Sequence, residues 1–343
     1  FMAELCNGKQ TLAVAGTHGK TTTSAFLTHI FSKTQQSFTS IMGGFFQGNP
    51  SNLIRTGDDF MLVEADEYDR SFLHLNPTVG AITSIDLDHL DVYQTREAFK
   101  KAFTKFSSQV SEQLIVAYDL PFEGLTYGVE VDADYRIYNL KHLEGGYEFD
   151  LMTPKENFSQ VKLNQLGEHN LSNMLCALAM ADQVKIPLDA ALKALISFPG
   201  VHRRMNLFKW NDKLLVDDYA HHPNEIKSVL KTLQAFYKEH RKCVIFQPHL
   251  FSRTQDFYQE FLAVLSEFDE VVLLDIYPAR ELPIKGITSA IMIDDLKHPS
   301  KKLIHKHMIS NTIMESEAKI FALLGAGDIG DEIQLLKSES LVE

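Results

Sequence analysis

Short apolar runs alternate with segments of helical periodicity through much of the chain. Uninterrupted apolar runs bounded by polar residues are typical of strands that are buried on both faces. In the first third of the sequence the expected strands are 11–16, 60–66, 79–86 and 112–119. The expected helices between them are 20–34 and 95–110. Strands that alternate with helices predict a mostly parallel sheet with helices on both faces.

The stretch 125–165 has a different pattern. Its apolar and polar residues alternate, and Gly145, Gly146 and Pro154 interrupt it. This pattern is typical of short antiparallel strands, so we expect a small antiparallel sheet here. Helical periodicity then returns at 167–184 and 188–197.

A second series of strands and helices begins after Pro199 and Gly200, which mark a linker within 197–204. The expected strands are 213–218, 242–247, 270–276 and 319–325, and the expected helices lie near 223–240, 254–267 and 329–338. The predicted fold class is therefore α/β. A central domain over 1–199 has a mostly parallel sheet plus a small antiparallel sheet, and a C-terminal Rossmann-like α/β domain covers 200–343.

The composition narrows the function classes. The 343 residues carry a formal net charge of -12, which argues against a nucleic-acid partner bound through a basic face. No apolar run reaches the roughly 18 residues that a membrane helix needs, so no membrane partner is expected. Cys6, Cys176 and Cys243 are scattered, without a C-x-x-C pair, which indicates a reducing compartment such as the cytoplasm. These features do not determine the oligomeric state.

The segment GTHGKTT, 16–22, carries the strongest chemical signal. Gly16, Gly19, Lys20 and Thr21 stand between an expected strand and an expected helix in the order G-x-x-G-K-T, shorter than the usual phosphate-binding loop. Backbone N–H groups at a helix N-terminus can bind phosphate oxygens, Lys20 adds a positive charge, and the Thr21 hydroxyl can reach Mg²⁺. The alternative is a glycine-rich turn with a solvated lysine. The complete G-K-T triplet favours a P-loop ATPase domain.

Two acidic segments follow neighbouring expected strands. Glu64 lies in LVEADEYDR, and His89 stands among three aspartates in SIDLDHLDVY. Carboxylate and imidazole groups at the carboxyl ends of parallel strands can hold divalent ions. We therefore interpret Thr21, Glu64 and His89 as candidate metal ligands. The alternatives are a solvated acidic turn and a surface histidine.

The second half of the chain has further candidate polar groups, one in the linker and the others at or just past the ends of expected strands. They are Arg204 in GVHRRM, Asp218, Tyr219 and His221 in VDDYAHHPNEI, and His249 and Arg253 in FQPHLFSRT. An arginine near the linker can stabilise charge on a transferred phosphoryl group, or it can form a salt bridge. A carboxylate can accept a ribose hydroxyl, and the histidines can act in acid–base steps or cap a helix.

The segment GAGDIG, 325–330, matches the pattern G-x-G-x-x-G between a strand and a helix. A dinucleotide site would also need a second strand with an acidic residue about 20 residues later. The sequence ends at Glu343, too early for that strand. We therefore interpret the segment as a tight strand-to-helix turn and not as an NAD site.

Eight segments occur together in an order that points to one enzyme family. They are AGTHGKTTT, VEADEYDRSFLHLNP, DLDHLD, GEHNLSN, GVHRR, DDYAHHPNEI, QPHLFSRT and GAGDIG. Across almost the whole chain the sequence resembles the Mur ligases, the ATP-dependent amide-bond ligases of peptidoglycan synthesis, which share the short G-x-x-G-K-[TS] loop. GTHGKTTT, DYAHHP and QPH are most similar to the branch that adds L-alanine.

The resemblance implies a two-step reaction. ATP phosphorylates the lactyl carboxylate of UDP-N-acetylmuramate, and the amine of L-alanine then attacks the acyl phosphate. UDP-N-acetylmuramate and L-alanine are thus the implied substrates, and ATP with Mg²⁺ (or Mn²⁺) the implied cofactors. Such chemistry needs phosphate binding, a divalent ion to offset negative charge, and close placement of the reactants.

The resemblance also implies roles for individual residues. It assigns the ATP phosphates to Gly16, Thr17, His18, Gly19, Lys20, Thr21 and Thr22, and the surroundings of adenine to His169, Asn170 and Asn173. It assigns Arg204 to the γ-phosphate and Asp218 to the ribose. The implied catalytic residues are Lys20, His89, Arg204, His221, His249 and Arg253.

The sequence departs from the family at several points. Ser84 stands where many relatives carry Asn, and Leu250 stands where the alanine-adding branch often has Arg. The N-terminal domain that binds uridine diphosphate in the family is not in this sequence, so we expect ATP–Mg²⁺ binding without efficient ligation. Three alternatives stay open: a recycling ligase that attaches a tripeptide, a folylpolyglutamate-type ligase, and an ATP-binding module without chemistry of its own.

Overall fold

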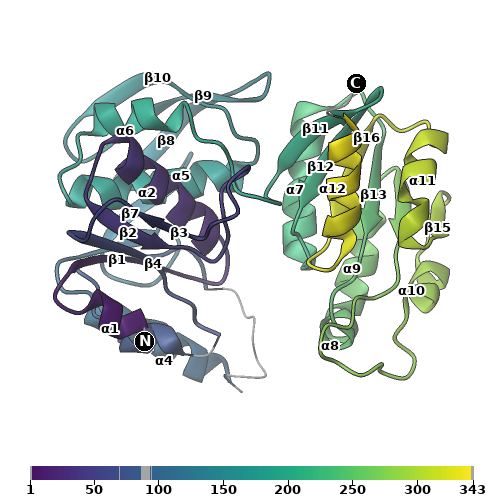
Figure 1. The fold of residues 1–343 in the computed structure, drawn as a ribbon, viewed down its shortest axis with the longest axis horizontal. Coiled ribbons are helices and arrows are strands. Elements are labelled where there is room, and N and C mark those ends of the chain that lie inside the picture. Colours follow the sequence, from purple (N-terminus) through teal and green to yellow (C-terminus); the bar gives the residue numbers. More distant parts are fainter. Residues whose placement is uncertain (1, 69, 86–92, 94, 341–343) are drawn as a thin grey trace. The chain divides into compact units, whose positions relative to one another are not determined.

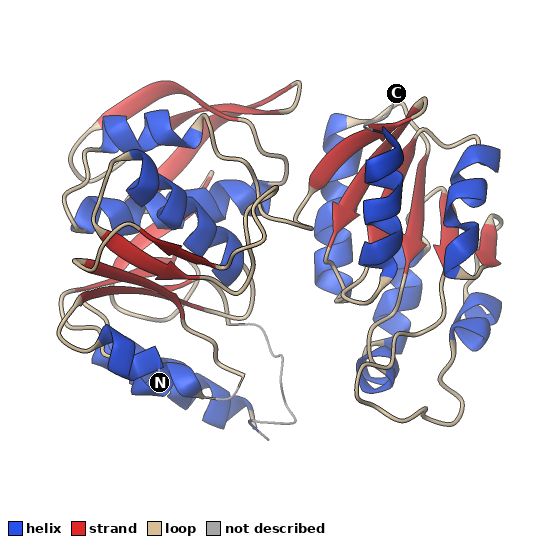
Figure 2. Cartoon of the chain, in the orientation of Figure 1, coloured by secondary structure: helices blue, strands red, loops and turns tan. Residues whose placement is uncertain are grey.

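The structure, a computed structural model, describes residues 2–68, 70–85, 93 and 95–340. The chain forms two compact units, Phe1–His202 and Arg203–Glu343. In each unit helices flank a central sheet, as the alternation of strands and helices predicts (Figures 1 and 2). No helix among the described residues is long and apolar enough to cross a bilayer.

A ten-stranded sheet organises the first unit, in the order β10-β9-β8-β7-β6-β5-β1-β4-β2-β3. Its strands are β1 (Gln10–Ala15), β2 (Phe38–Ile41), β3 (Leu53–Arg55), β4 (Phe60–Glu64), β5 (Val79–Ile82), β6 (Gln113–Ala117), β7 (Leu125–Val129), β8 (Tyr135–Leu143), β9 (Gly146–Met152) and β10 (Asn157–Leu163). Strand β1 pairs in parallel with both β4 and β5. The carboxyl ends of these three strands therefore meet at one edge of the sheet, where open α/β sheets bind ligands.

Helices cover both faces of this sheet. On one face α2 (Lys20–Lys33) packs against α5 (Glu168–Gln183) and α6 (Leu188–Leu195) (Figure 1). On the other face lie α1 (Met2–Cys6), the 3₁₀ helix η1 (Ser71–His74) and α4 (Arg96–Gln109). The helical repeat of three phenylalanines in α4 is explained here, because all three are buried in the core: Phe99, Phe103 and Phe106.

The antiparallel strands expected in 125–165 form, and the structure refines their place. β8, β9 and β10 make an antiparallel meander. The meander extends the main sheet, because β7 pairs in parallel with both β6 and β8. An alternating pattern predicts which residues of a strand face solvent, but it does not predict which strand pairs with it. The pairing of the meander with the parallel sheet was therefore not predicted.

A six-stranded sheet organises the second unit, in the order β11-β12-β16-β13-β14-β15. Its strands are β11 (Asn206–Trp210), β12 (Lys213–Asp218), β13 (Lys242–Phe246), β14 (Glu270–Leu273), β15 (Lys301–Leu303) and β16 (Ile320–Leu324). β11 pairs antiparallel to β12, and the other neighbours pair in parallel. The carboxyl ends of β12, β13 and β16 thus share one edge.

The helices of the second unit also lie on both faces. α11 (Ile309–Glu315) and α12 (Ile329–Ser340) cover one face, and α7 (Pro223–Phe236) and α9 (Tyr258–Leu265) pack together on the other (Figure 1). The remaining helices are α8 (Phe251–Asp256), α10 (Ser289–Asp295) and η2 (Lys306–Met308). Where one helix was expected near 254–267 the structure has two, α8 and α9, because the backbone leaves helical geometry at Phe257 (φ -112°, ψ 25°).

Candidate functional site

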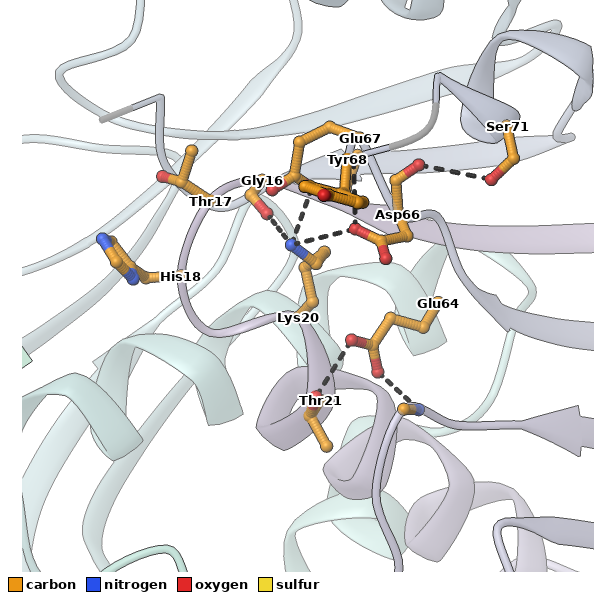
Figure 3. Close-up of polar contacts among 12 residues, drawn as sticks. Gly16, Thr17, His18, Lys20, Thr21, Glu64, Asp66, Glu67, Tyr68 and Ser71 are labelled. Atoms are coloured by element: carbon orange, nitrogen blue, oxygen red, sulfur yellow. Dashed lines mark hydrogen bonds and ion pairs between the residues drawn. The ribbon is translucent and has the colours of Figure 1, made fainter. Parts of the chain in front are cut away.

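The phosphate-loop segment connects β1 to α2 at the carboxyl edge of the first sheet. Its two glycines have positive φ angles, 134° at Gly16 and 82° at Gly19, a region that suits glycine. Lys20 is the first residue of α2, and Thr21 and Thr22 lie in its first turn (Figure 3). The loop therefore ends at a helix N-terminus, whose free N–H groups favour a bound anion.

Both loop glycines are also closely packed. A Cβ on Gly16 would lie 2.1 Å from Thr83 Oγ1, and one on Gly19 would lie 2.4 Å from Asn173 Oδ1. The first contact comes from the end of β5 and the second from α5. At Gly16 the Ser84 backbone nitrogen would also be 2.9 Å away, so a larger residue there would displace the loop, whereas at Gly19 the Asn173 side chain could move aside.

Ser84 holds the loop in place. The Ser84 hydroxyl accepts a hydrogen bond from the His18 N–H at 2.8 Å and lies 2.8 Å from the Thr17 hydroxyl. The Ser84 carbonyl accepts the Thr17 N–H at 3.1 Å. Ser84, just past the end of β5, thereby fixes Thr17 and His18. No sequence pattern predicted this role.

Lys20 lies between a backbone carbonyl and a buried carboxylate. Its Nζ donates to Gly16 O and to Glu67 Oε2, both at 2.6 Å (Figure 3). The Glu67 side chain has no exposed surface. Burial raises the pKa of Glu67, and the Lys20 charge offsets part of that effect. Sequence reasoning missed Glu67, although it follows Glu64 by three residues in VEADE.

Thr21 and Glu64, two of the three expected metal ligands, are in contact. The Thr21 hydroxyl donates to Glu64 Oε1 at 2.9 Å, and the Gly43 N–H donates to Glu64 Oε2 at 2.7 Å (Figure 3). Hydroxyl and carboxylate oxygens are the ligands that Mg²⁺ prefers. The third expected ligand, His89, lies outside the described residues, as do the aspartates around it.

The three residues expected near adenine begin α5. Asn170 is 3% exposed, its Nδ2 donates to Leu166 O at 2.6 Å, and its Oδ1 has no hydrogen-bond partner among the described residues. A buried acceptor of this kind suits an amino group on a ligand. Asn173 lies against the loop at Gly19, and the His169 ring lies over Gly167.

The two arginines of GVHRR have different surroundings in the second unit. Arg203 is buried; its Nε lies 3.3 Å from Asp217 Oδ1, and its guanidinium donates to the carbonyls of Gly325 and Gly327. Both guanidinium groups lie over the Tyr219 ring, each 5.3 Å from guanidinium carbon to ring centroid. Arg203 thus connects three chain segments of the unit, whereas Arg204 remains half-buried at the surface.

Asp218 ends β12 and is 6% exposed. Its carboxylate accepts the Met205 and Ala220 N–H groups at 2.7 and 2.8 Å. Burial raises the pKa of Asp218 to about 6, against the lowering effect of Arg204. A carboxylate with fixed oxygens is suited to accept hydroxyl donors such as those of a ribose.

His221, His249 and Arg253 come together at the carboxyl ends of β12 and β13. The rings of His221 and His249 are 6.0 Å apart, and Arg253 Nη1 donates to His249 Nδ1 at 3.1 Å. His221 Nδ1 donates to Tyr219 O at 3.0 Å. Burial lowers the pKa of His221. Burial, together with the nearby His221 and Arg253, lowers the pKa of His249 to about 4. Both imidazoles are therefore neutral near pH 7.

The glycines of GAGDIG form the expected turn between β16 and α12. A Cβ on Gly325 would lie 2.7 Å from Gln247 O, and one on Gly330 would lie 2.7 Å from Arg203 Nη1. These close approaches within the second unit account for the repeated glycines.

Two family profiles match this chain. The Mur ligase middle domain matches residues 14–181, and the Mur ligase glutamate ligase domain matches residues 203–329.

Known proteins with similar sequences and structures carry related names. The chain is 46% identical over 338 residues to a UDP-N-acetylmuramate–L-alanine ligase of Christiangramia forsetii, covering 98% of this chain and 75% of the relative. The crystal structure of UDP-N-acetylmuramate-alanine ligase from Thermotoga maritima superposes with a TM-score of 0.81 at 26% identity, covering 98% of this chain and 76% of that one. A murein peptide ligase from Psychrobacter arcticus shares the fold, with a TM-score of 0.67 at 22% identity over 96% of this chain and 77% of the other.

Proposed function

The chain belongs to the Mur ligase family, and from this we propose that it uses ATP to join L-alanine to the lactyl carboxylate of UDP-N-acetylmuramate. The product is an amide-linked precursor of peptidoglycan. The observation that carries the proposal is the 46% identity, over 98% of the chain, to a ligase named for that reaction. The lactyl carboxylate takes the γ-phosphoryl group of ATP, which releases ADP and gives an acyl phosphate. The amine of L-alanine then attacks the acyl carbon, loses a proton and expels inorganic phosphate.

The loop 16–22 binds the ATP phosphates in this proposal. Two features support it: the glycine backbone at the start of α2 and the Lys20 ammonium at its first residue. Asn170 and Asn173 lie near the adenine, and the unpartnered Asn170 Oδ1 accepts its amino group. In the second unit Asp218 binds the ribose and Arg204 the γ-phosphate.

The residues present fit a divalent ion, Mg²⁺ or Mn²⁺. Glu64 and Thr21 supply hard oxygen ligands already within 2.9 Å of each other, and His89 is the third proposed ligand. When bound, the ion neutralises phosphate charge and so makes phosphoryl transfer easier. The N–H of Gly43 fixes the Glu64 carboxylate, so the protein orients this ligand in advance.

The imidazole and arginine cluster of the second unit binds the acceptor amino acid and transfers its protons. His221 donates its Nδ1 hydrogen to Tyr219 O, so its Nε2 carries the lone pair and can take a proton from the attacking amine. His249 accepts from Arg253 at Nδ1, so its Nε2 carries hydrogen and can donate to an oxygen. Arg253 provides a positive charge for the acceptor carboxylate.

We place the reaction in the cytoplasm. The proposal is supported by the three cysteines, all free and buried, which suits a reducing compartment.

The decisive assay measures ADP release by the full-length protein with UDP-N-acetylmuramate and a series of acceptors: L-alanine, glycine, L-serine and a tripeptide. We expect L-alanine to be the best acceptor, by about tenfold over glycine, since one methyl group in a pocket discriminates only modestly. Faster release with the tripeptide would favour the recycling ligase instead.

Two sets of variants separate a ligase from a binding module. Lys20→Ala removes ATP binding under either hypothesis. His249→Ala and Arg253→Ala should lower turnover and leave nucleotide affinity unchanged if the chain is a ligase. ATP binding without any acceptor-dependent ADP release by the wild-type protein would support a module without chemistry.

A further inference from the structure

Lys20 pairs with Glu67, a residue that has no role in the reaction proposed above. Its Nζ lies 2.6 Å from Glu67 Oε2, and the two side chains are 12% and 0% exposed. The neighbouring Asp66 Oδ1 is 3.9 Å from the same nitrogen and is 59% exposed, so solvent screens its charge. The ammonium group is therefore paired with a carboxylate that water does not reach.

The main chain at Glu67 is held firmly. Its carbonyl accepts the Tyr93 hydroxyl at 2.6 Å and the Arg70 N–H at 3.0 Å. Tyr93 is 2% exposed and its ring meets the edge of Phe99 in the core, 4.8 Å between centroids. Glu67 is thus anchored to the core beneath α4 and presents its carboxylate from a rigid support.

The donor geometry leaves room for a ligand. An ammonium group has three N–H donors. Gly16 O and Glu67 Oε2 accept two of them within the described residues. The further contact of the ammonium, with Asp66 Oδ1 at 3.9 Å, is too long for a hydrogen bond (Figure 3). The third N–H can therefore meet a phosphate oxygen while the other two keep the side chain in place.

We propose that Glu67 is a positioning residue for Lys20. It holds the ammonium against Gly16 so that the remaining N–H is directed at the transferred phosphoryl group. Its negative charge also lies close to the phosphate site and weakens binding of the nucleotide phosphates. The proposal rests on the proposed function in one respect, namely that a nucleoside triphosphate occupies the loop.

The first test is Glu67→Gln, which keeps the side-chain size and removes the charge. We expect ADP·Mg²⁺ to bind about 3- to 10-fold more tightly by calorimetry, because a buried negative charge near the phosphates is gone. We expect kcat for ADP release to fall about 10-fold or more, because Lys20 loses its charged anchor. Asp66→Asn is the matched control, and both quantities should stay within about twofold of wild type, because that carboxylate is screened.

A thermal cycle tests the pairing without nucleotide. Lys20→Met leaves Glu67 buried without its cation and should lower Tm, and adding Glu67→Gln should restore part of the loss. Should Glu67→Gln alone not fold, Glu67→Asp replaces it in the kinetic test. That variant keeps the charge but shortens the reach, so we expect lower kcat without tighter nucleotide binding.

The outcomes separate this inference from the proposed function. If the wild-type chain binds neither ADP·Mg²⁺ nor ATP·Mg²⁺, the proposed function fails. If it binds them but Glu67→Gln changes neither affinity nor kcat by more than twofold, only the role of Glu67 is overturned. Equal Tm values for Lys20→Met and the double variant would overturn it as well.

Discussion

The polar groups at the two sheet edges are stabilised in different ways. In the first unit the charged groups have charged or hydroxyl partners: Lys20 pairs with Glu67, and Glu64 accepts from Thr21. In the second unit His221 and His249 pack ring against ring, and burial keeps both neutral. These differences support the proposal that the first edge binds a charged ligand and the second transfers protons.

Under the proposed function, the two edges of one fold class serve two kinds of chemistry. Phosphate binding needs fixed charge, so the first edge uses short ion pairs and close glycine contacts. An attacking amine needs a proton acceptor that is uncharged near pH 7, so the second edge uses desolvated imidazoles. Both edges are formed by carboxyl ends of parallel strands, and only the side chains there differ.

Within the second unit, the sharpest contrast is between two adjacent arginines. Arg203→Leu leaves Asp217, which is 0% exposed, with Lys337 as its remaining cation, so we expect a loss of about 2–4 kcal/mol in the free energy of unfolding. Arg204→Leu should change that free energy by less than about 0.5 kcal/mol, because Arg204 is partly exposed. Its turnover should instead fall about 100-fold if Arg204 makes the proposed contact with the γ-phosphate.

Urea unfolding and ADP release on the same pair of variants check this contrast. Similar stability losses in both would show that the second arginine is structural too, and would remove Arg204 from the reaction.

For the first unit, Glu64→Gln tests the proposed metal site. The amide keeps the shape of Glu64 and its acceptor oxygen for Thr21 or Gly43, but loses the charge that attracts the ion. We expect turnover at fixed Mg²⁺ to fall about 10- to 100-fold and the Mg²⁺ requirement to rise. A Mg²⁺ titration of ADP release measures both. Asp59→Asn, at an exposed acid just before β4, is the control, and an unchanged Mg²⁺ curve for Glu64→Gln would contradict the site.

The smallest expected effect concerns the pH dependence of the second unit. The pKa of His249 falls from its ordinary value of 6.5 to about 4 on folding. The unfolded chain therefore takes up this proton first as pH falls, and the folded state loses stability as pH falls from about 6.5 towards 4. As the pH falls over this range, we expect the free energy of unfolding to drop by about 1–2 kcal/mol less in His249→Gln than in wild type. The figure is reduced because His249 is partly exposed.

Urea unfolding at pH 7.5 and pH 5 on both proteins measures this difference. Asp218 acts in the opposite sense: its raised pKa, about 6, gives stability that is present at low pH and lost as pH rises through 6. Comparing variant with wild type cancels that contribution. His240→Gln, at an exposed histidine of the same unit, should match wild type at both pH values.

Much of the fold could be predicted from local pattern. The expected strand 213–218 coincides with β12, and the expected helix 20–34 differs from α2 by one residue at its end. Three-residue strands such as β3 and β15 could not be predicted, because they are too short to show a period. The prediction of one continuous helix near 254–267 was wrong, because no proline or glycine marks the break at Phe257.

The candidate site was predicted unevenly. Lys20, Thr21 and Glu64 were selected from sequence, and the structure places the last two in contact. Their roles stay predictions. Glu67 and Ser84 were missed, since each acts through a contact with the loop that lies about 50 or more residues away along the chain.

Periodicity and motif order were sufficient to identify an α/β chain with a phosphate loop, because those signals lie between near neighbours in sequence. The partners of Lys20 and Arg203 depend on which strands meet at a sheet edge. Burial then separates a structural arginine at 203 from an accessible one at 204, although the two are chemically identical and adjacent. Such differences arise from long-range packing and solvent exclusion, which no local pattern of residues encodes.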